Sequence, residues 1–413
     1  MHLALMLLAL FTVPENRAKP EGRTIEIAYV RLPSTAENPG PPIVFLNGGP
    51  GQPATPAARS EFWLSKIEPL RRVADVILLD QRGIGQSRPE LRCADVIADP
   101  AMFFSDDPAA WESMQSAARA CARQLREQGI DLAAYNTIES AHDVEDLRRA
   151  LGVPQIDLLA FSYGTHLALA VIRQHPQSVR RAVLIGTEGP DHTWKLPSTG
   201  DVQLMKIGAG SLRNVLQKAA AEPFRVEIRD RRRDETIVMP VGASGLQRIF
   251  EADLGDSRDF KSFPALIDEL ERGETTLLTP LVQKRFDQAQ SPVQMMGRAM
   301  DCASWVSPTR LARIRVEARS AILGNAANAR DEHLCPEIGV PPLDAEFREP
   351  LISSVPTLFV SGTMDANTPP FQAEEVRWGF VNGEHLIVEG AGHEDLLTSD
   401  AVMKAISDFL AKG

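Results

Sequence analysis

The chain has little that would suit it to a membrane or to nucleic acid. Its N-terminal apolar run, Leu3–Phe11, is shorter than the roughly 20 residues that a membrane-spanning helix requires. Acidic side chains outnumber basic ones by 55 to 44 among the 413 residues, which gives a formal net charge of −11 and a pI near 5.3. This charge disfavours nucleic acid and anionic membrane surfaces as partners. We therefore expect neither nucleic-acid binding nor integral membrane association.

Cysteine is also scarce. The four cysteines show no C-x-x-C spacing, so zinc-binding and thioredoxin-like chemistry have no support. Neither a metal nor an organic cofactor is implied. Four cysteines allow three disulfide pairings, and their spacing does not choose among them or exclude four free thiols.

The N-terminal run allows two interpretations. Leu3–Phe11 is similar to the apolar core of an export signal, but the sequence around it has no basic leader and no small-x-small cleavage site. The run also continues directly into Thr12 and Val13, as a first strand of the mature domain would. It is either a truncated signal or a strand.

Composition and periodicity indicate an ordinary globular α/β protein. Hydrophobic residues make up 44% and charged residues 24% of the chain. Thr24–Leu32 alternates apolar and polar residues and predicts an antiparallel strand, while short uninterrupted apolar runs predict strands buried on both faces. These runs are Ile43–Leu46, Val76–Leu79, Ile156–Leu159, Ala182–Ile185, Thr357–Val360 and His385–Val388. Helices are expected between them, including Glu61–Arg72, Ser140–Leu151 with Ser140 as its cap, and Ala401–Ala411.

The alternation of strands and helices is interrupted once. Residues 189–343 contain amphipathic helical segments instead, and their basic patch Arg229–Arg233 is interpreted as a solvated turn. The sequence thus predicts an α/β fold, with a mostly parallel central sheet flanked by helices and an inserted helical lid, and the serine motif at Ala160–Gly164 makes it an α/β-hydrolase fold. Residues 12–188 and 344–413 would form the core, and residues 189–343 the lid, inserted after about the sixth strand.

A candidate nucleophile lies where one predicted strand meets a helix. Ser162 follows an apolar run and precedes a helix-forming segment, as the serine of a nucleophile elbow does. The usual motif G-x-S-x-G is present as A-x-S-x-G, with Ala160 and Gly164 at the two small positions. Small residues are needed there because the strand and the helix approach closely.

Two further polar residues follow predicted strands. Asp365 comes after Thr357–Val360 and His393 after His385–Val388, and the carboxyl ends of parallel strands meet at one edge of a sheet. The order Ser162, Asp365, His393 is that of an α/β-hydrolase triad. His393 would accept the serine proton, and Asp365 would orient the imidazole and stabilise its charged form.

An oxyanion formed on attack needs N–H donors already in place. One candidate is the amide of Tyr163, at the start of the helix after the nucleophile. The other is a glycine amide in Asn47–Gly51, most directly Gly49 with Gly48 beside it.

Taken together, the motifs NGGPG, DQRGIGQS, SYGT, GTMDANTP and GAGHE resemble those of the prolyl and tripeptidyl aminopeptidase family of α/β-hydrolases. The resemblance runs from Val13 to the C-terminal helix. A loop that begins with Asn47, the sequence CASW from Cys302, and a later Cys-Pro are similar to the tripeptidyl-aminopeptidase-like branch. The resemblance implies Ser162 as nucleophile, Asp365 as orienting residue, His393 as base, and a cap over the site.

The same resemblance implies two disulfides, Cys93–Cys121 and Cys302–Cys335. It also favours an exported protein, with a cytoplasmic location left open by the incomplete signal. Asp80 and Arg82 could be taken for catalytic groups, but an arginine in such a loop more often ties neighbouring strand ends together.

The expected activity is that of a serine exopeptidase that releases residues or short peptides from free N-termini. Such an enzyme must hold the substrate ammonium, and the candidate carboxylates nearest in sequence are Glu188 and Glu394. The alternatives are a serine esterase acting on small acyl esters and a non-catalytic binding protein on a hydrolase scaffold. Dehalogenases and epoxide hydrolases of this fold carry Asp at the elbow, so Ser162 disfavours both.

Overall fold

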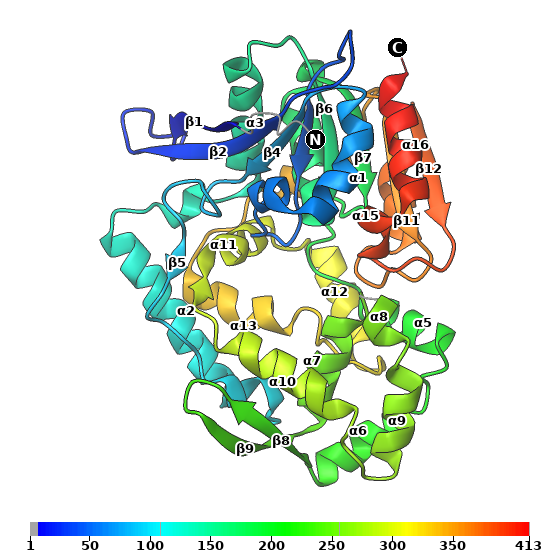
Figure 1. The fold of residues 1–413 in the computed structure, drawn as a ribbon. Helices are drawn as coiled ribbons and strands as arrows, with labels where there is room; N and C mark the ends of the chain where they lie inside the picture. Colours follow the sequence, from blue (N-terminus) through cyan, green and yellow to red (C-terminus); the bar gives the residue numbers. More distant parts are fainter. Residues whose placement is uncertain (1–6, 108, 256, 413) are drawn as a thin grey trace.

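The computed structural model describes residues 7–107, 109–255 and 257–412. Its centre is an eight-stranded sheet in the order β1-β2-β4-β3-β6-β7-β11-β12 (Figure 1). Pairing is antiparallel from β1 to β2 and from β2 to β4, and parallel across the other six strands. The strands are β1 Leu7–Pro14, β2 Thr24–Leu32, β3 Ile43–Leu46, β4 Val76–Asp80, β6 Ile156–Phe161, β7 Val179–Ile185, β11 Thr357–Gly362 and β12 Gly383–Val388.

Both faces of the sheet are covered by helices, which is why the parallel strands are uninterrupted apolar runs. One face packs against α3 (Thr137–Ala150), α4 (Tyr163–Gln174) and α14 (Pro370–Arg377), through residues such as Leu158 and Leu167. The other packs against α1 (Glu61–Arg71), α15 (Asp395–Thr398) and α16 (Asp400–Ala411). The α/β-hydrolase architecture expected from the sequence is confirmed in this core.

Two local expectations differ from the structure. Helix α3 begins three residues before Ser140, because the side chain of Asn136 accepts a 2.9 Å hydrogen bond from the Glu139 amide and caps the first turn. Ser140 is buried inside the helix. At the N-terminus, Leu7–Pro14 pairs with β2 as a strand, whereas residues 3–6 of the apolar run lie outside the described residues.

The insertion follows β7, which is the sixth strand of the large sheet along the chain. Much of residues 189–343, here called the lid segment, packs in a hydrophobic cluster that contains Phe250, Phe263 and Phe286 together with Phe104, whereas buried residues of its last part, such as Met300 and Ile338, pack with the central sheet. Their helices are α5 Pro197–Lys206, α6 Leu212–Ala221, α7 Ala243–Asp253, α8 Ser257–Phe260, α9 Phe263–Glu271, α10 Leu278–Ala289, α11 Met295–Ser304, α12 Pro308–Glu317 and α13 Ala329–Ile338.

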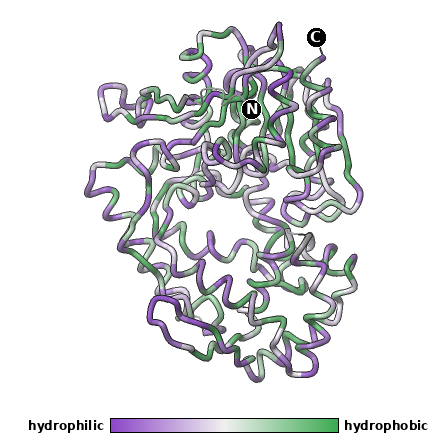
Figure 2. Tube along the Cα trace, in the orientation of Figure 1, coloured by the Kyte–Doolittle hydropathy of each residue, from purple (hydrophilic) through white to green (hydrophobic). Residues whose placement is uncertain are grey.

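The lid segment also contains an antiparallel hairpin that the helical pattern did not predict. Strands β8 (Phe224–Asp230) and β9 (Glu235–Val241) pair along their length, and the basic patch forms their solvent-exposed turn. Figure 2 shows this hairpin as mostly hydrophilic, in contrast to the strands of the central sheet. In β8, buried Val226 and Ile228 alternate with exposed polar residues. This alternation with a period of two is the pattern in the sequence that indicates a strand here, although the segment is largely polar.

Helix α2 (Ala110–Glu127) belongs to the stretch between β4 and β6 but lies against the lid segment (Figure 1). Trp111 stacks on His333 of α13 with ring centroids 4.3 Å apart. Arg119 pairs with Glu337 of the same helix at 2.8 Å. The short antiparallel pairing of β5 (Arg92–Cys93) with β10 (Val293–Gln294) also connects residues 92–127 to the lid segment. Residues 92–127 therefore form part of the wall that faces the lid segment.

Both disulfides implied by the family resemblance are present. Cys93–Cys121 ties β5 to α2, and Cys302–Cys335 ties α11 to α13. No cysteine is left free. No helix among the described residues is long and apolar enough to cross a membrane.

Candidate active site

Ser162 occupies a strained turn between β6 and α4. Its backbone has φ 54° and ψ −127°, a conformation that side-chain-bearing residues rarely adopt and that clusters at functional sites. The Ser162 amide is held by the Ile185 carbonyl at 2.9 Å. A Cβ at Gly164 would lie 2.0 Å from the Leu46 carbonyl oxygen. The close approach of strand and helix that the elbow motif predicts is therefore present, and Ala160 is completely buried beside it.

The glycine loop after β3 lies directly against this serine. A Cβ at Gly48 would come within 2.8 Å of the Ser162 Cβ, and Gly49 has φ 113°. The Gly48 amide donates to the Asn47 side chain at 2.9 Å. In the described part of the chain, the amides of Gly49 and Tyr163 have no acceptor, so both can donate to an oxyanion.

Asp365 and His393 form a hydrogen-bonded pair. The carboxylate Oδ2 lies 2.7 Å from the imidazole Nδ1, and both residues are buried. Thr368, which sequence reasoning did not single out, donates its hydroxyl to the same Oδ2 at 2.7 Å and its amide to Oδ1 at 2.8 Å. The sequence does contain a pattern that indicates this role for Thr368. It lies three residues after Asp365, a spacing typical of turns in which an aspartate side chain accepts hydrogen bonds from the residues that follow it.

The His393 ring lies beside the nucleophile turn. Its centroid is 4.7 Å from the ring of Phe161, the residue before Ser162. A Cβ at Gly186 would come within 2.9 Å of the His393 Cε1 atom. The His393 amide donates to the Gly255 carbonyl of the lid segment at 3.0 Å. The structure thus brings all three predicted triad residues to the same edge of the sheet.

The charges of this pair stabilise each other. Burial by itself lowers the pKa of His393, but the charge of Asp365 and its hydrogen bond outweigh burial and raise that pKa above its ordinary value. Burial by itself raises the pKa of Asp365, but His393 and the Thr368 donors outweigh it and lower that pKa. The aspartate is therefore ionised, and the imidazole is a stronger base than a free histidine.

The two carboxylates predicted to hold substrate lie in different surroundings. Glu188 is buried and pairs with the Lys195 ammonium at 2.6 Å. Burial raises its pKa, but the charges of Lys195 and His166 outweigh burial and lower it. Glu394 is exposed and lines a largely apolar cavity of about 540 Å³ together with Phe161 and Trp63.

A second cavity, of about 250 Å³, is lined by the lid segment, by residues between 102 and 114 and by Asn367, and we call it the lid cleft. Its polar lining consists of Lys195, Arg248, Glu251, Arg298, Arg330, Asp331 and Asn367. The backbone amide of Asn367 donates to Asp365 at 2.8 Å, so one lining residue contacts the triad, although Ser162, Asp365 and His393 do not themselves line the cleft. Glu251 has no hydrogen bond or ion pair among the described residues, and burial raises its pKa to about 7. Nothing in the sequence distinguished it from other acids on amphipathic helices.

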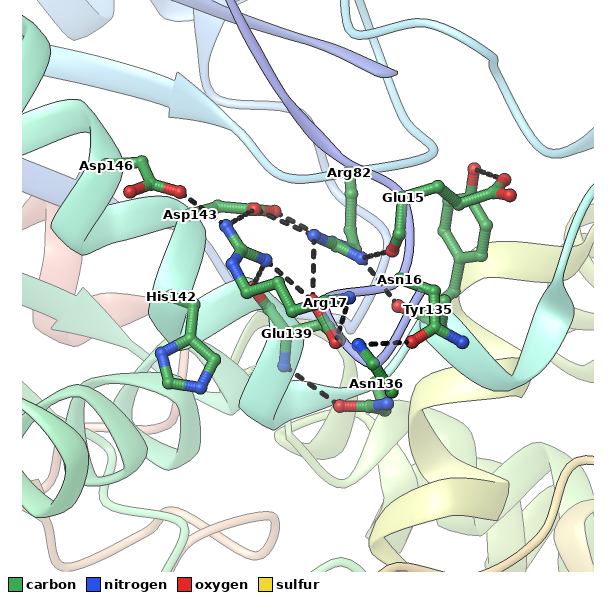
Figure 3. A network of polar contacts seen from close by, with 12 residues as sticks. Glu15, Asn16, Arg17, Arg82, Tyr135, Asn136, Glu139, His142, Asp143 and Asp146 are labelled. Carbon is green, nitrogen blue, oxygen red and sulfur yellow. Dashed lines mark hydrogen bonds and ion pairs between the residues drawn. The ribbon is translucent and has the colours of Figure 1, made fainter. Parts of the chain in front are cut away.

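Arg82 and Asp80 are structural, as their positions suggested. Arg82 is fully buried and binds both oxygens of Asp143 at 2.7 Å. It also donates to the carbonyls of Glu15 and Ala134 (Figure 3). Asp80 accepts hydrogen bonds from Thr55 and other residues of the loop after Pro53. These bonds fix the loops beneath the site.

No three His, Cys, Asp or Glu side chains in the described ranges are grouped so that they could hold a metal ion. Nucleophilic catalysis by a serine requires a hydroxyl, a base, an orienting carboxylate and oxyanion donors, and Ser162, the hydrogen-bonded His393–Asp365 pair and the amides of Gly49 and Tyr163 can supply these groups.

Comparison with known proteins agrees with this geometry. Residues 41–233 match the family described as alpha/beta hydrolase fold, and residues 320–413 match the family described as TAP-like protein. The chain is 31% identical over 188 residues to the serine protease Hip1 of Mycobacterium tuberculosis, covering 43% of this chain and 35% of that protein. It is 30% identical over 198 residues to the tripeptidyl aminopeptidase of Streptomyces coelicolor, covering 44% and 36%.

The chain thus matches little more than a third of the length of these relatives. Among solved structures, a thermophilic esterase from Thermogutta terrifontis covers 98% of both chains at 16% identity, with a TM-score of 0.45. At that similarity its activity has no bearing on this chain.

Proposed function

The chain belongs to the α/β-hydrolases of the prolyl and tripeptidyl aminopeptidase family, and we propose that it is a serine exopeptidase acting through an acyl-enzyme. The observation that carries the proposal is the strained Ser162 turn, set between the buried Asp365–His393 pair and two unengaged amides. Hip1 and the tripeptidyl aminopeptidase are, by name, peptidases. The geometry is common to serine peptidases and esterases, and the names of these relatives favour peptide substrates.

The proposed reaction follows from the positions of these groups. His393 removes the proton of the Ser162 hydroxyl as the oxygen attacks the scissile carbonyl, and the resulting oxyanion accepts hydrogen bonds from Gly49 and Tyr163. The imidazolium then gives its proton to the leaving amine, the C–N bond breaks, and an ester to Ser162 remains. Water, deprotonated by His393, hydrolyses that ester and restores the serine. Each amide donor contributes roughly 3 kcal/mol to lowering the barrier.

An exopeptidase also needs a carboxylate for the substrate ammonium. Glu188 and Glu394 remain candidates, although the charge of Glu188 is already balanced by Lys195. We add Glu251, because its carboxyl group lines the lid cleft with no hydrogen bond or ion pair among the described residues, and burial raises its pKa more than the charge of Lys195 lowers it. A substrate ammonium would compensate the charge of its ionised form.

Two disulfides suit an oxidising compartment, where such bonds form and persist. They support the proposal that the protein works outside the cytoplasm.

A paired kinetic assay tests this function. Aminoacyl and tripeptidyl arylamides with free N-termini are compared with the same compounds N-acetylated and with short-chain aryl esters. An exopeptidase cleaves the free-amine amides and loses that activity on acetylation. Hydrolysis of esters without any amide cleavage would instead identify a serine esterase. The ion pair with Lys195 favours this alternative if it prevents Glu188 from binding a substrate ammonium.

A further inference from the structure

The lid cleft is basic although the protein is acidic. Four cationic side chains line it, from Lys195, Arg248, Arg298 and Arg330, against the carboxyl groups of Glu251 and Asp331, in a chain of net charge −11. An adjoining cavity of about 400 Å³ shares Arg298 and Arg330 and adds Arg285. The concentration of arginine in this part of the molecule therefore runs against the overall charge.

The protein's own carboxylates balance only part of this charge. Lys195 pairs with Glu188 at 2.6 Å, and Arg298 pairs with Asp331 at 3.1 Å. Asp301 also lies 3.6 Å from Arg298, but burial, reinforced by the neighbouring Asp331, raises the pKa of Asp301 well above its ordinary value, so it offsets the charge of Arg298 less than an ordinary aspartate would. Glu251, with a pKa of about 7, is only partly ionised at neutral pH.

Two of the lining arginines, Arg248 and Arg330, make no ion pair with any residue that the structure describes. Arg248 donates to the carbonyls of Phe103 and Ser105 and lies over the rings of Phe103 and Trp111, contacts that fix its position without neutralising it. Arg330 makes no hydrogen bond and no ion pair among the described residues. The nearby charge of Arg298, with burial, lowers the pKa of Arg330 to about 10, and the charges of Asp331 and Asp301 offset this effect only in part.

A covalent bond holds these two like charges together. Arg298 lies on α11 and Arg330 on α13, and the Cys302–Cys335 disulfide joins the same two helices. Without a compensating anion this arrangement costs free energy, whereas a bound carboxylate would accept charge-assisted bonds from preoriented guanidinium groups.

We propose that Arg330, with Arg298 and Arg248, forms a subsite in the lid cleft for a carboxylate of the peptide substrate. The carboxylate can belong to an acidic side chain in the released N-terminal fragment or to the free C-terminus of a short peptide. The subsite adds to the proposed peptidase function a selectivity for anionic peptides, and it rests on that function.

The test compares acid and amide pairs of equal shape. Tripeptidyl arylamides carrying Glu or Gln at each of the three positions in turn probe the side-chain source, and tetra-alanine with a free or an amidated C-terminus probes the terminal source. We expect kcat/KM to be at least about tenfold higher for the acid in one of these pairs. In Arg330→Gln that ratio should fall to about one while cleavage of all-neutral arylamides persists, and Arg330→Lys should keep part of the ratio.

The control is Arg315→Gln, which removes an exposed arginine of α12 in the lid segment and should leave the ratio unchanged. Ratios near one in every pair, or a ratio that Arg330→Gln does not change, would overturn the subsite while cleavage of neutral substrates leaves the peptidase function standing. If no substrate is cleaved, calorimetric titration of the Ser162→Ala protein with the Glu and Gln tripeptides decides. Tighter binding of the Glu peptide that depends on Arg330 supports the subsite, and equal binding contradicts it.

Discussion

At the scale of single residues, the proposed chemistry depends on a base whose pKa is set by one carboxylate. His393 is buried among the ring of Phe161, the Gly186 turn and the Gly255 carbonyl, and burial alone would make it a weaker base than free histidine. Asp365 reverses that effect. The histidine must be neutral to accept the serine proton, so activity is expected to fall as the pH drops below its raised pKa.

Asp365→Asn should therefore change both the rate and its pH dependence. Without the carboxylate, burial lowers the pKa of His393, so the acidic limb of kcat/KM moves to lower pH, and the maximal rate falls by about 10⁴-fold because the imidazole is no longer oriented. A pH–rate profile from pH 4.5 to 9 measures both effects. Glu389→Gln, which removes an exposed carboxylate four residues before His393, is the control and should leave the profile in place. If the acidic limb of kcat/KM stays at the same pH in Asp365→Asn, a group other than His393 determines that limb.

Glu251 gives a prediction about stability. Its pKa in the folded protein, about 7, exceeds the ordinary value of 4.5, so folding favours its protonated form. The free energy of unfolding therefore loses a contribution as the pH rises from 4.5 through 7, and the full cost is present above pH 7. Glu251→Gln should raise the melting temperature relative to wild type at pH 8.5 and change it little at pH 5, as measured by scanning calorimetry.

The same variant should also raise KM for free-amine substrates if Glu251 holds the ammonium. Glu222→Gln, at an exposed carboxylate of the lid segment, is the matched control for both measurements. A stabilisation of equal size at both pH values would contradict the account of Glu251.

At the scale of elements, the sequence predicted the structure best where the local sequence pattern and the tertiary packing require the same residues. The strand Ile43–Leu46 has the expected bounds because its apolar run is bounded by prolines and glycines and buried on both faces. The A-x-S-x-G motif located the elbow because the approach of α4 to β3 leaves no room for a side chain at Gly164. The start of α3 was missed because a serine and an asparagine can both cap a helix, and only the structure shows which side chain accepts the amide.

Gly164→Ala tests that close approach directly. The added methyl group would meet the Leu46 carbonyl at 2.0 Å, so α4 must move away from β3, and the free energy of unfolding should fall by about 2–3 kcal/mol. Urea denaturation measures the loss. Gly40→Ala, where the nearest atom to the new Cβ is 3.7 Å away, should change stability far less. Equal stabilities of the two variants would show that the helix and strand are not packed this tightly.

At the scale of the whole molecule, chain order predicted how the core assembles but not what surrounds the site. The order of Ser162, Asp365 and His393 after buried strands was sufficient to place them at one edge, because parallel strands leave few alternatives. The contact of α2 with α13 and the basic lid cleft depend on how two separate helical layers meet. The contacts of α2 with α13 join residues more than 200 positions apart, and neither these contacts nor the cleft has a periodic signature in the sequence.

The central claim is that Ser162 is the nucleophile, and the most direct measurement is fluorophosphonate labelling of the purified protein, read by intact mass, together with turnover of a tripeptidyl arylamide. We predict one stoichiometric adduct on Ser162, parallel loss of activity, and no adduct in Ser162→Ala. That variant should lose more than about 10⁴-fold in kcat while its melting temperature stays close to that of wild type, because alanine keeps the Cβ and the backbone hydrogen bond from residue 162 to the Ile185 carbonyl. An adduct on another residue, or a variant that keeps most of its turnover, would contradict the account.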